Sequence, residues 1–381
     1  MSFKSIYTLV MILLFFITVN SYAEEKDYGD LLNNLNREKS ELQLIYTAEK
    51  ISALDKKSIK GKTYASRLRM VYAGIDEAKK LLGNHRIYFS DSLKDKKRIV
   101  FLDPGHGGKD VGATVPPIVG QEQETYFLTE SSITFRIAQR VKSLLENYGY
   151  GVILTRPNEE DGLSLYARSA LCRASKADIS VSIHLNSSQY AFPIFERMDT
   201  AMPELNYSRV FVWGPEPYDF FYPFYNQIHA QIKESGSRQK TLALANSLAE
   251  ALYAATNVSH ELPEEQLAKL DSVKKLRADL AMQKIPSETT EIPLYDIVPG
   301  ILEKNNKISA MYKEDIKNLP GVNGKDLHMV REIPCIPAVL IEPVFLSAPE
   351  EQEKIISNNR IEEISLGIAA GIINYFTSEE D

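Results

Sequence analysis

Three apolar segments of the sequence each end at a side chain that can bind a metal ion or carry a proton. His106 follows the apolar run at 98–103, His184 follows the run at 178–183, and Glu342 follows the run at 338–341. Active sites in open α/β sheets gather at the carboxyl ends of the strands. If these runs are strands of one such sheet, the three side chains lie at the same edge of it. Glu130 opens the helical segment that follows the His106 loop and is a fourth candidate.

The types of these four residues point to metal-assisted hydrolysis. Two histidines and one carboxylate are a common ligand set for a catalytic zinc ion, which keeps its fourth position for water. We therefore predict one Zn²⁺ per chain, held by His106, Glu130 and His184. Glu342 remains outside the ligand set and would act as general base toward water and as acid toward the leaving amine. Each residue alone also has an ordinary explanation, such as a carboxylate favoured in the first turn of a helix by the helix dipole.

The segments around these residues alternate between strand and helix patterns. Strands are predicted at 98–103, 151–155, 178–183, 208–213 and 338–341, and helices at 130–147, 163–175, 241–255 and 350–376. This alternation predicts an α/β domain at 96–381, with a mixed, mostly parallel sheet flanked by helices. Two stretches, at about 189–240 and 258–327, break the alternation and are interpreted as insertions. The aromatic residues of 211–225 are expected to form a local hydrophobic cluster, with a sugar-binding groove as the alternative.

The N-terminal part of the sequence contains no candidate catalytic or metal-binding residues. Residues 1–23 read as a signal peptide, with Lys4 before a short apolar core and small residues at Ser21 and Ala23. The core is short for a spanning helix, so we expect cleavage and no stable membrane anchor afterwards. Residues 24–95 show two amphipathic stripes separated by a break at 60–62, which predicts a helical hairpin.

Composition narrows the possible partners and the role of the cysteines. The 381 residues carry a net charge of −7 without a basic stripe, which argues against nucleic acid as a partner. Cys172 and Cys335 could form a disulfide in an oxidising compartment. We expect two separate buried thiols instead, because both lie in segments that look like core.

Five motifs together resemble the zinc-dependent N-acetylmuramoyl-L-alanine amidases (amidase type 3) of bacterial cell-wall hydrolysis. They are 103–113, Glu130 with its helix, 165–168, 177–186 and 339–347, so the resemblance covers roughly 98–188 and 328–376. It implies a zinc site at His106, Glu130 and His184, with Glu342 as the catalytic carboxylate. It also implies hydrolysis of the amide between the lactyl group of N-acetylmuramic acid and L-alanine of peptidoglycan, in cell-wall remodelling or daughter-cell separation.

The sequence departs from the family pattern at several positions. The loop after His106 is long and also holds Glu122 and Glu124. Glu130 is preferred to these because it keeps the helix register of the family's ligand. Pro343 and Val344 replace an apolar–glycine pair, and the valine is expected to narrow the site.

The resemblance also suggests regulation and a location. In some Gram-negative relatives, an inserted helix covers the zinc until a protein activator moves it. Residues 263–282, with acids at Glu261, Glu264 and Glu265 nearby, are a candidate for such a helix, and a surface helix without a regulatory role is the alternative. An exported chain without wall-binding repeats fits the periplasm first and the extracellular cell wall second. Two other functions stay open, namely a catalytically silent peptidoglycan-binding or regulatory protein and a zinc peptidase acting on stem peptides.

Overall fold

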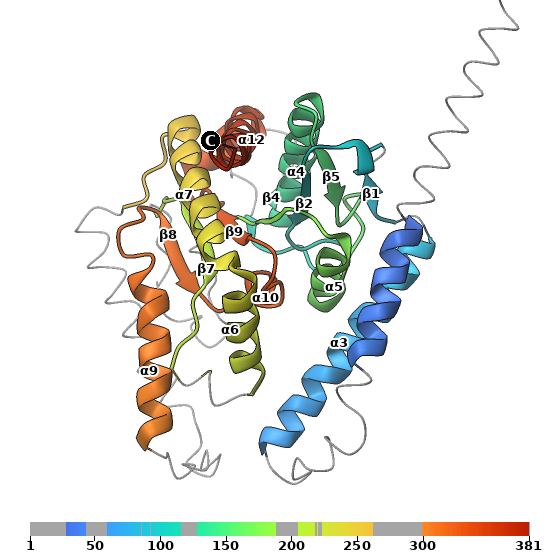
Figure 1. Cartoon of the computed structure of the whole chain (residues 1–381). Coiled ribbons are helices and arrows are strands. Elements are labelled where there is room, and N and C mark those ends of the chain that lie inside the picture. The colour runs from blue at the N-terminus through green and yellow to red at the C-terminus, as the bar shows by residue number, and fades with distance from the viewer. Residues whose placement is uncertain are drawn as a thin grey trace, which may run out of the picture.

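A seven-stranded sheet forms the centre of the protein in the computed structural model (Figure 1). The structure describes residues 28–42, 59–115, 128–187, 205–261 and 299–380, apart from 85, 92, 218 and 220–222. The strand order is β1-β5-β2-β6-β9-β7-β8 (Figure 1). The strands are β1 Tyr88–Phe89, β5 Gly151–Leu154, β2 Ile99–Pro104, β6 Ile179–Ile183, β9 Ala338–Glu342, β7 Arg209–Trp213 and β8 Val322–Lys325. Strands β5, β2, β6 and β9 run parallel, whereas β1 pairs antiparallel with β5 and β7 pairs antiparallel with β9. The mixed, mostly parallel sheet predicted from the sequence is therefore confirmed.

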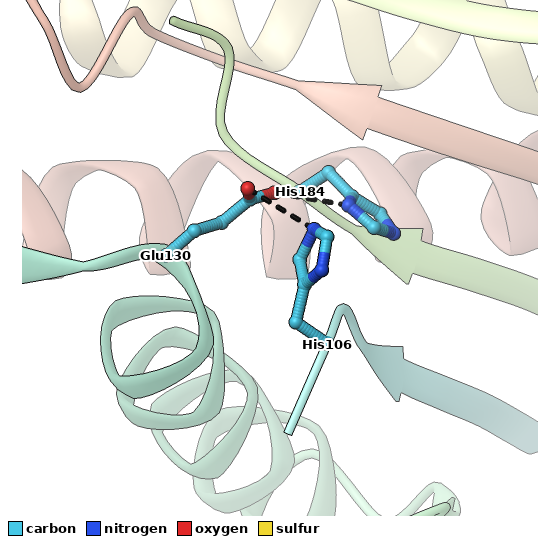
Figure 2. Close-up of side chains that lie close together, drawn as sticks. All are labelled: His106, Glu130 and His184. Atoms are coloured by element: carbon cyan, nitrogen blue, oxygen red, sulfur yellow. Dashed lines mark hydrogen bonds and ion pairs between the residues drawn. The ribbon is translucent and has the colours of Figure 1, made fainter. Parts of the chain in front are cut away.

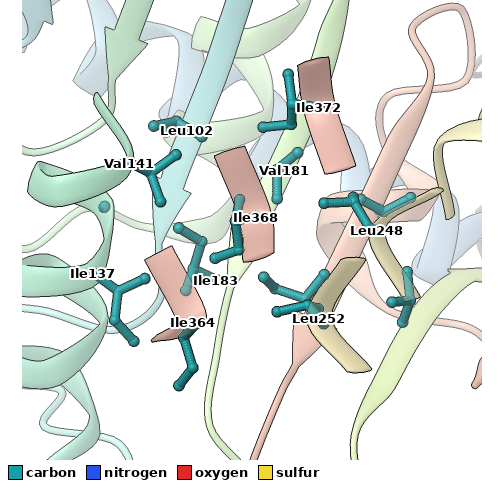
Figure 3. Close-up of a cluster of buried hydrophobic side chains, with 14 of the residues drawn as sticks. Leu102, Ile137, Val141, Val181, Ile183, Leu248, Leu252, Ile364, Ile368 and Ile372 are labelled. Atoms are coloured by element: carbon teal, nitrogen blue, oxygen red, sulfur yellow. The ribbon is translucent and has the colours of Figure 1, made fainter. Parts of the chain in front are cut away.

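Helices cover both faces of this sheet. On one face lie α4 Glu130–Asn147, α7 Ser237–Thr256 and α12 Asn359–Ser378, whose apolar side chains meet those of the strands, such as Leu102 and Ile183 (Figure 3). On the other face, Phe101 packs with α5 Leu165–Ser175 and the short α10 His328–Arg331. Because both faces are buried, the central strands β2, β6 and β9 consist mainly of apolar residues, and the serines of β6 are buried as well.

The N-terminal helices are part of the domain core. Residues 28–42 form a helix, and it packs beside α3 Ile59–Gly83 (Figure 1). Leu35 and Ile75 are fully buried in the same cluster as Leu171 of α5. The predicted helix pair is confirmed, but the predicted break at 60–62 is wrong because these residues lie inside α3. A glycine costs a helix only about 1 kcal/mol relative to alanine, which is too little to end it.

The described residues contain no helix that is long and apolar enough to cross a membrane. The predicted signal peptide at 1–23 lies outside the described residues.

The C-terminal helix differs from its prediction. Residues 350–376 were expected to form one helix, but the structure has α11 Pro349–Ile356 followed by α12. Asn358 separates them with a left-handed φ of 65°, a conformation that asparagine tolerates better than most residues.

The two stretches predicted as insertions also supply elements of the main sheet. The first contains β7 and α6 Pro223–Ser235, and the second contains α9 Pro299–Glu314 and β8. Phe211, Trp213, Phe224 and Tyr225 are buried together with Tyr312 of α9, so the prediction of a hydrophobic cluster is confirmed.

Both cysteines are free thiols, as expected, but only one of them is buried. Cys172 lies in the core of α5, whereas Cys335 is exposed. The expectation of two buried thiols is therefore wrong for Cys335. This residue lies in the turn that precedes β9 and not in the strand itself.

Candidate metal centre

His106 is held by an unusual backbone conformation just beyond β2. Its φ is 59°, in the left-handed region, and Gly107 and Gly108 continue with positive φ. The Arg168 guanidinium donates hydrogen bonds to the carbonyl oxygens of Pro104, at 2.8 Å, and of His106. Such a conformation costs free energy and persists where surrounding contacts fix it. The direction of the His106 ring is therefore set by its loop.

Glu130 is the first residue of α4 and its side chain is almost fully buried. The Thr129 side chain caps the helix by accepting a hydrogen bond from the Ser132 amide at 3.3 Å. The two Glu130 carboxylate oxygens accept hydrogen bonds from the amides of Ala113 and Leu185, each at 2.9 Å. These bonds fix the carboxylate between the start of strand β3 Thr114–Val115 and the segment after β6. Strand β3 pairs with β4 Leu128–Thr129, which leads into α4.

The three predicted ligands converge at one point (Figure 2). His106 Nε2 lies 3.0 Å from Glu130 Oε2, and His184 Nδ1 lies 2.9 Å from Glu130 Oε1. All the potential ligand atoms lie within 4.8 Å of one another. The other ring nitrogen of His106, Nδ1, contacts Asp110 Oδ2 at 2.9 Å. A carboxylate on the second nitrogen is the usual means of orienting a metal-binding histidine.

The charges of the cluster suit a cation. Burial alone would raise the pKa of Glu130, but its hydrogen bonds to His106 and His184 outweigh burial and hold that pKa far below its usual range. Burial would lower the pKa of His106, and the hydrogen bonds to Glu130 and Asp110 reverse this and raise it. The carboxylate is therefore ionised at neutral pH.

Two glycines leave the space that the cluster needs. A Cβ atom on Gly105 would lie 2.5 Å from His184 Cε1, and one on Gly112 would lie 2.6 Å from Glu130 Oε2. Real Cβ contacts essentially never fall below 3.0 Å. Two imidazoles and a buried carboxylate, with glycines making room for them, fit the donor set and size of a zinc site.

Glu342 lies at the same edge of the sheet. It is the last residue of β9, whose Ile341 pairs with Ile183 immediately before His184. Its Oε2 accepts a hydrogen bond from the Asn186 side-chain amide at 2.7 Å. Burial raises the pKa of Glu342, although the nearby His184 and Lys325 charges and the Asn186 hydrogen bond act in the opposite direction.

The matches to known proteins agree with this geometry. Residues 100–283 match the family described as N-acetylmuramoyl-L-alanine amidase. This segment of the chain is therefore similar to that family. The N-acetylmuramoyl-L-alanine amidase AmiC of Escherichia coli O6:H1 is 25% identical over 285 residues, which cover 74% of this chain and 54% of that protein. The N-acetylmuramoyl-L-alanine amidase AmiA of Escherichia coli K12 is also 25% identical, over 74% of this chain and 76% of that protein.

The chain thus spans about half the length of AmiC. Among solved structures, the N-acetylmuramoyl-L-alanine amidase AmiC2 of Nostoc punctiforme covers 74% of this chain with 20% identity and a TM-score of 0.41. The family match includes all three ligand positions and ends before Glu342.

Several other predicted residues can be placed, and some cannot. Glu261 is exposed. Glu122, Glu124, Glu264, Glu265 and the predicted regulatory helix at 263–282 lie outside the described residues.

Val344, which was expected to narrow the site, is fully buried in the core cluster.

Sequence reasoning missed the residues that orient the candidate ligands. Asp110 lies four residues after His106, a spacing that hints at a contact, and Asn186 ends the motif that contains His184. No sequence signal marked Arg156, which lies buried beneath the His106 loop.

Proposed function

We propose that this protein is a zinc-dependent N-acetylmuramoyl-L-alanine amidase that cleaves the lactyl–L-alanine amide of peptidoglycan. The observation that carries the proposal is the convergence of His106, Glu130 and His184, with all ligand atoms within 4.8 Å, inside the segment that matches the family. A zinc ion held there would supply a Lewis acid that polarises the amide carbonyl and lowers the pKa of water.

The residues around the cluster prepare it for this chemistry. Asp110 holds the His106 ring by its Nδ1 atom, which leaves Nε2 directed at the cluster. Two backbone amides hold the Glu130 carboxylate in place before any ion arrives. A site whose ligands are held in advance loses less conformational entropy on binding.

Glu342 is proposed to move the proton. As a general base it removes a proton from the attacking water, and as a general acid it returns the proton to the nitrogen of the leaving L-alanine. Burial raises the pKa of this carboxyl group, which makes its protonated form easier to reach at neutral pH. The hydrogen bond from Asn186 at Oε2 fixes the orientation of the carboxylate.

We also propose export to the periplasm, with the extracellular cell wall as the second location. The apolar N-terminal segment supports export, and the relatives AmiC and AmiA are named as N-acetylmuramoyl-L-alanine amidases. Residues 259–300 are proposed to restrain the site until a protein activator engages them. Deletion of 259–300 should then raise basal activity, and unchanged activity in a folded deletion would refute the restraint.

The test is a digestion of purified peptidoglycan by residues 24–381, either loaded with zinc or treated with chelator. Mass spectrometry of the soluble products should show stem peptides with a free N-terminal L-alanine. These products should be absent from the chelated sample and from the Glu342→Gln variant. Cleavage within the stem peptide would instead indicate a peptidase. Zinc binding without products, both in this chain and in the 259–300 deletion, would favour a silent peptidoglycan-binding protein.

A further inference from the structure

Arg156 is a fully buried arginine whose guanidinium contacts backbone carbonyl oxygens. Its Nη2 donates to Ser131 O at 2.7 Å and to Gly105 O at 3.1 Å. Its Nε donates to Pro104 O at 3.3 Å, and its Nη1 donates to Glu159 O at 2.9 Å. Within the described part of the chain, no carboxylate forms an ion pair with it. Its hydrogen bonds therefore join segments of backbone.

The segments joined by Arg156 carry two of the three proposed metal ligands. Gly105 immediately precedes His106, and Ser131 immediately follows Glu130. The same Gly105 oxygen also accepts a hydrogen bond from Thr134 Oγ1 of α4, at 3.1 Å. Arg156 Nη2 also lies 3.5 Å from Thr134 Oγ1, so the two side chains form one small network around the Gly105 oxygen. This network fixes the distance between the His106 loop and the first turn of α4.

A guanidinium suits this role better than other side chains of the same size. It presents five N–H donors in a rigid plane, so it can hold several acceptors at fixed positions simultaneously. An apolar side chain would fill the same volume without the cost of burying a charge. Burial lowers the pKa of Arg156 to about 10, with the neighbouring Arg168 charge contributing, so the group stays protonated at neutral pH.

We propose that Arg156 is a positioning residue that preorganises His106 and Glu130 for the metal ion by clamping the His106 loop to the start of α4. This inference rests on the proposed metal site. Arg168 has a different role because it contacts Asp103, the carbonyl of Leu163 and the loop itself at Pro104 and His106, but not α4.

The test compares Arg156→Lys with Arg360→Lys in the chain of residues 24–381. Arg360 is an equally buried arginine, and its bidentate ion pair with Glu351 joins α12 to α11. Lysine keeps the positive charge in both variants and removes the planar guanidinium group with its several N–H donors. Affinity for Zn²⁺ and Co²⁺ is measured by competition with a chromophoric chelator, and thermal unfolding reports the stability of each variant.

Arg156→Lys should bind both ions about 10- to 100-fold more weakly, the usual effect of losing a group that supports metal ligands. Arg360→Lys should lose stability but keep the metal affinity of the natural chain. In the metal-free proteins, amide hydrogen exchange over 104–113 should be faster in Arg156→Lys alone. Natural metal affinity and natural exchange in a folded Arg156→Lys variant would overturn the proposal.

Thr134→Val provides a second, milder variant if Arg156→Lys does not fold. It removes the hydroxyl that reaches Gly105 and should weaken metal binding by a few fold, with faster exchange over 104–113. Unchanged exchange in this variant would overturn the clamp. If the natural chain binds neither ion, the proposed zinc site fails, and the exchange comparison in the metal-free proteins still decides the clamp.

Discussion

Gly105→Ala should disable the site without unfolding the protein. The new Cβ would lie 2.5 Å from His184 Cε1 and 2.7 Å from both ring nitrogens. Ordinary contact begins at 3.4 Å, so the ring must retreat by about 0.9 Å or rotate. Either movement breaks the 2.9 Å contact between His184 Nδ1 and Glu130 Oε1.

The size of the effect follows from the tolerance of a metal site. Zinc–ligand distances are held to within about 0.2 Å, several times less than the displacement required. A misplacement of about 1 Å at a reacting centre costs about 100-fold in rate, or about 2.7 kcal/mol. The backbone itself accepts alanine because the φ of Gly105 is not left-handed. Loss of glycine flexibility in the unfolded chain adds about 0.4–1 kcal/mol of stability, which offsets part of the clash.

The assay measures stem-peptide release from peptidoglycan, zinc affinity and denaturant unfolding for each variant. Gly83→Ala is the matched control. Gly83 ends α3, and apart from its chain neighbours and its own helix backbone no atom lies within 4 Å of the position that an alanine Cβ would take there. It should retain activity and zinc affinity. A folded Gly105→Ala variant with natural zinc affinity and natural rate would refute the reasoning.

Three further predictions follow from the same site. Glu342→Gln should lower kcat by about 10²–10⁴-fold with unchanged zinc affinity, because only the proton transfer is lost. An equal loss of kcat and of zinc affinity would contradict the role of Glu342 in proton transfer. Asn186→Ala should move the acid limb of the pH–rate profile to higher pH, because the lost hydrogen bond favours the ionised Glu342; a shift to lower pH would count against this. Burial would raise the pKa of Asp103, but the Arg168 charge and two hydroxyl hydrogen bonds outweigh burial and lower it. The ionised Asp103 therefore stabilises the folded protein above an unfolded-state pKa of about 3.9, and this stabilisation is lost as the pH falls through the lower folded-state pKa. Asp103→Asn should therefore cost about 3–5 kcal/mol in urea unfolding at pH 7, with a smaller difference from the natural chain in acid, and a difference that grows in acid would contradict the assignment.

Much of the fold could be predicted because the central strands are simple in sequence. The runs at 98–103, 178–183 and 338–341 are rich in Ile, Val and Leu, and both faces of those strands are buried. Short elements with weak patterns were missed. Strands β1, β3 and β4 have two residues each, and such segments form only because a neighbouring strand is present. The antiparallel direction of β7 also depends on its pairing with β9, and the sequence of β7 itself does not indicate this direction.

The sequence by itself determined the chemical identity of the site. His106, His184 and Glu342 stand at strand ends, and strand ends are recognisable from local apolar patterns. Glu130 was placed by helix register, and the structure brings it to both histidines.

Only the tertiary structure decided how these groups act together. His184 and Glu130 are 54 positions apart in the chain, and Arg156 reaches Gly105 across 51. Distances of this kind, the direction of each pKa shift, and the exposure of Cys335 depend on which segments pack together. No local pattern encodes them, because the free energy that fixes them comes from contacts between segments distant in sequence.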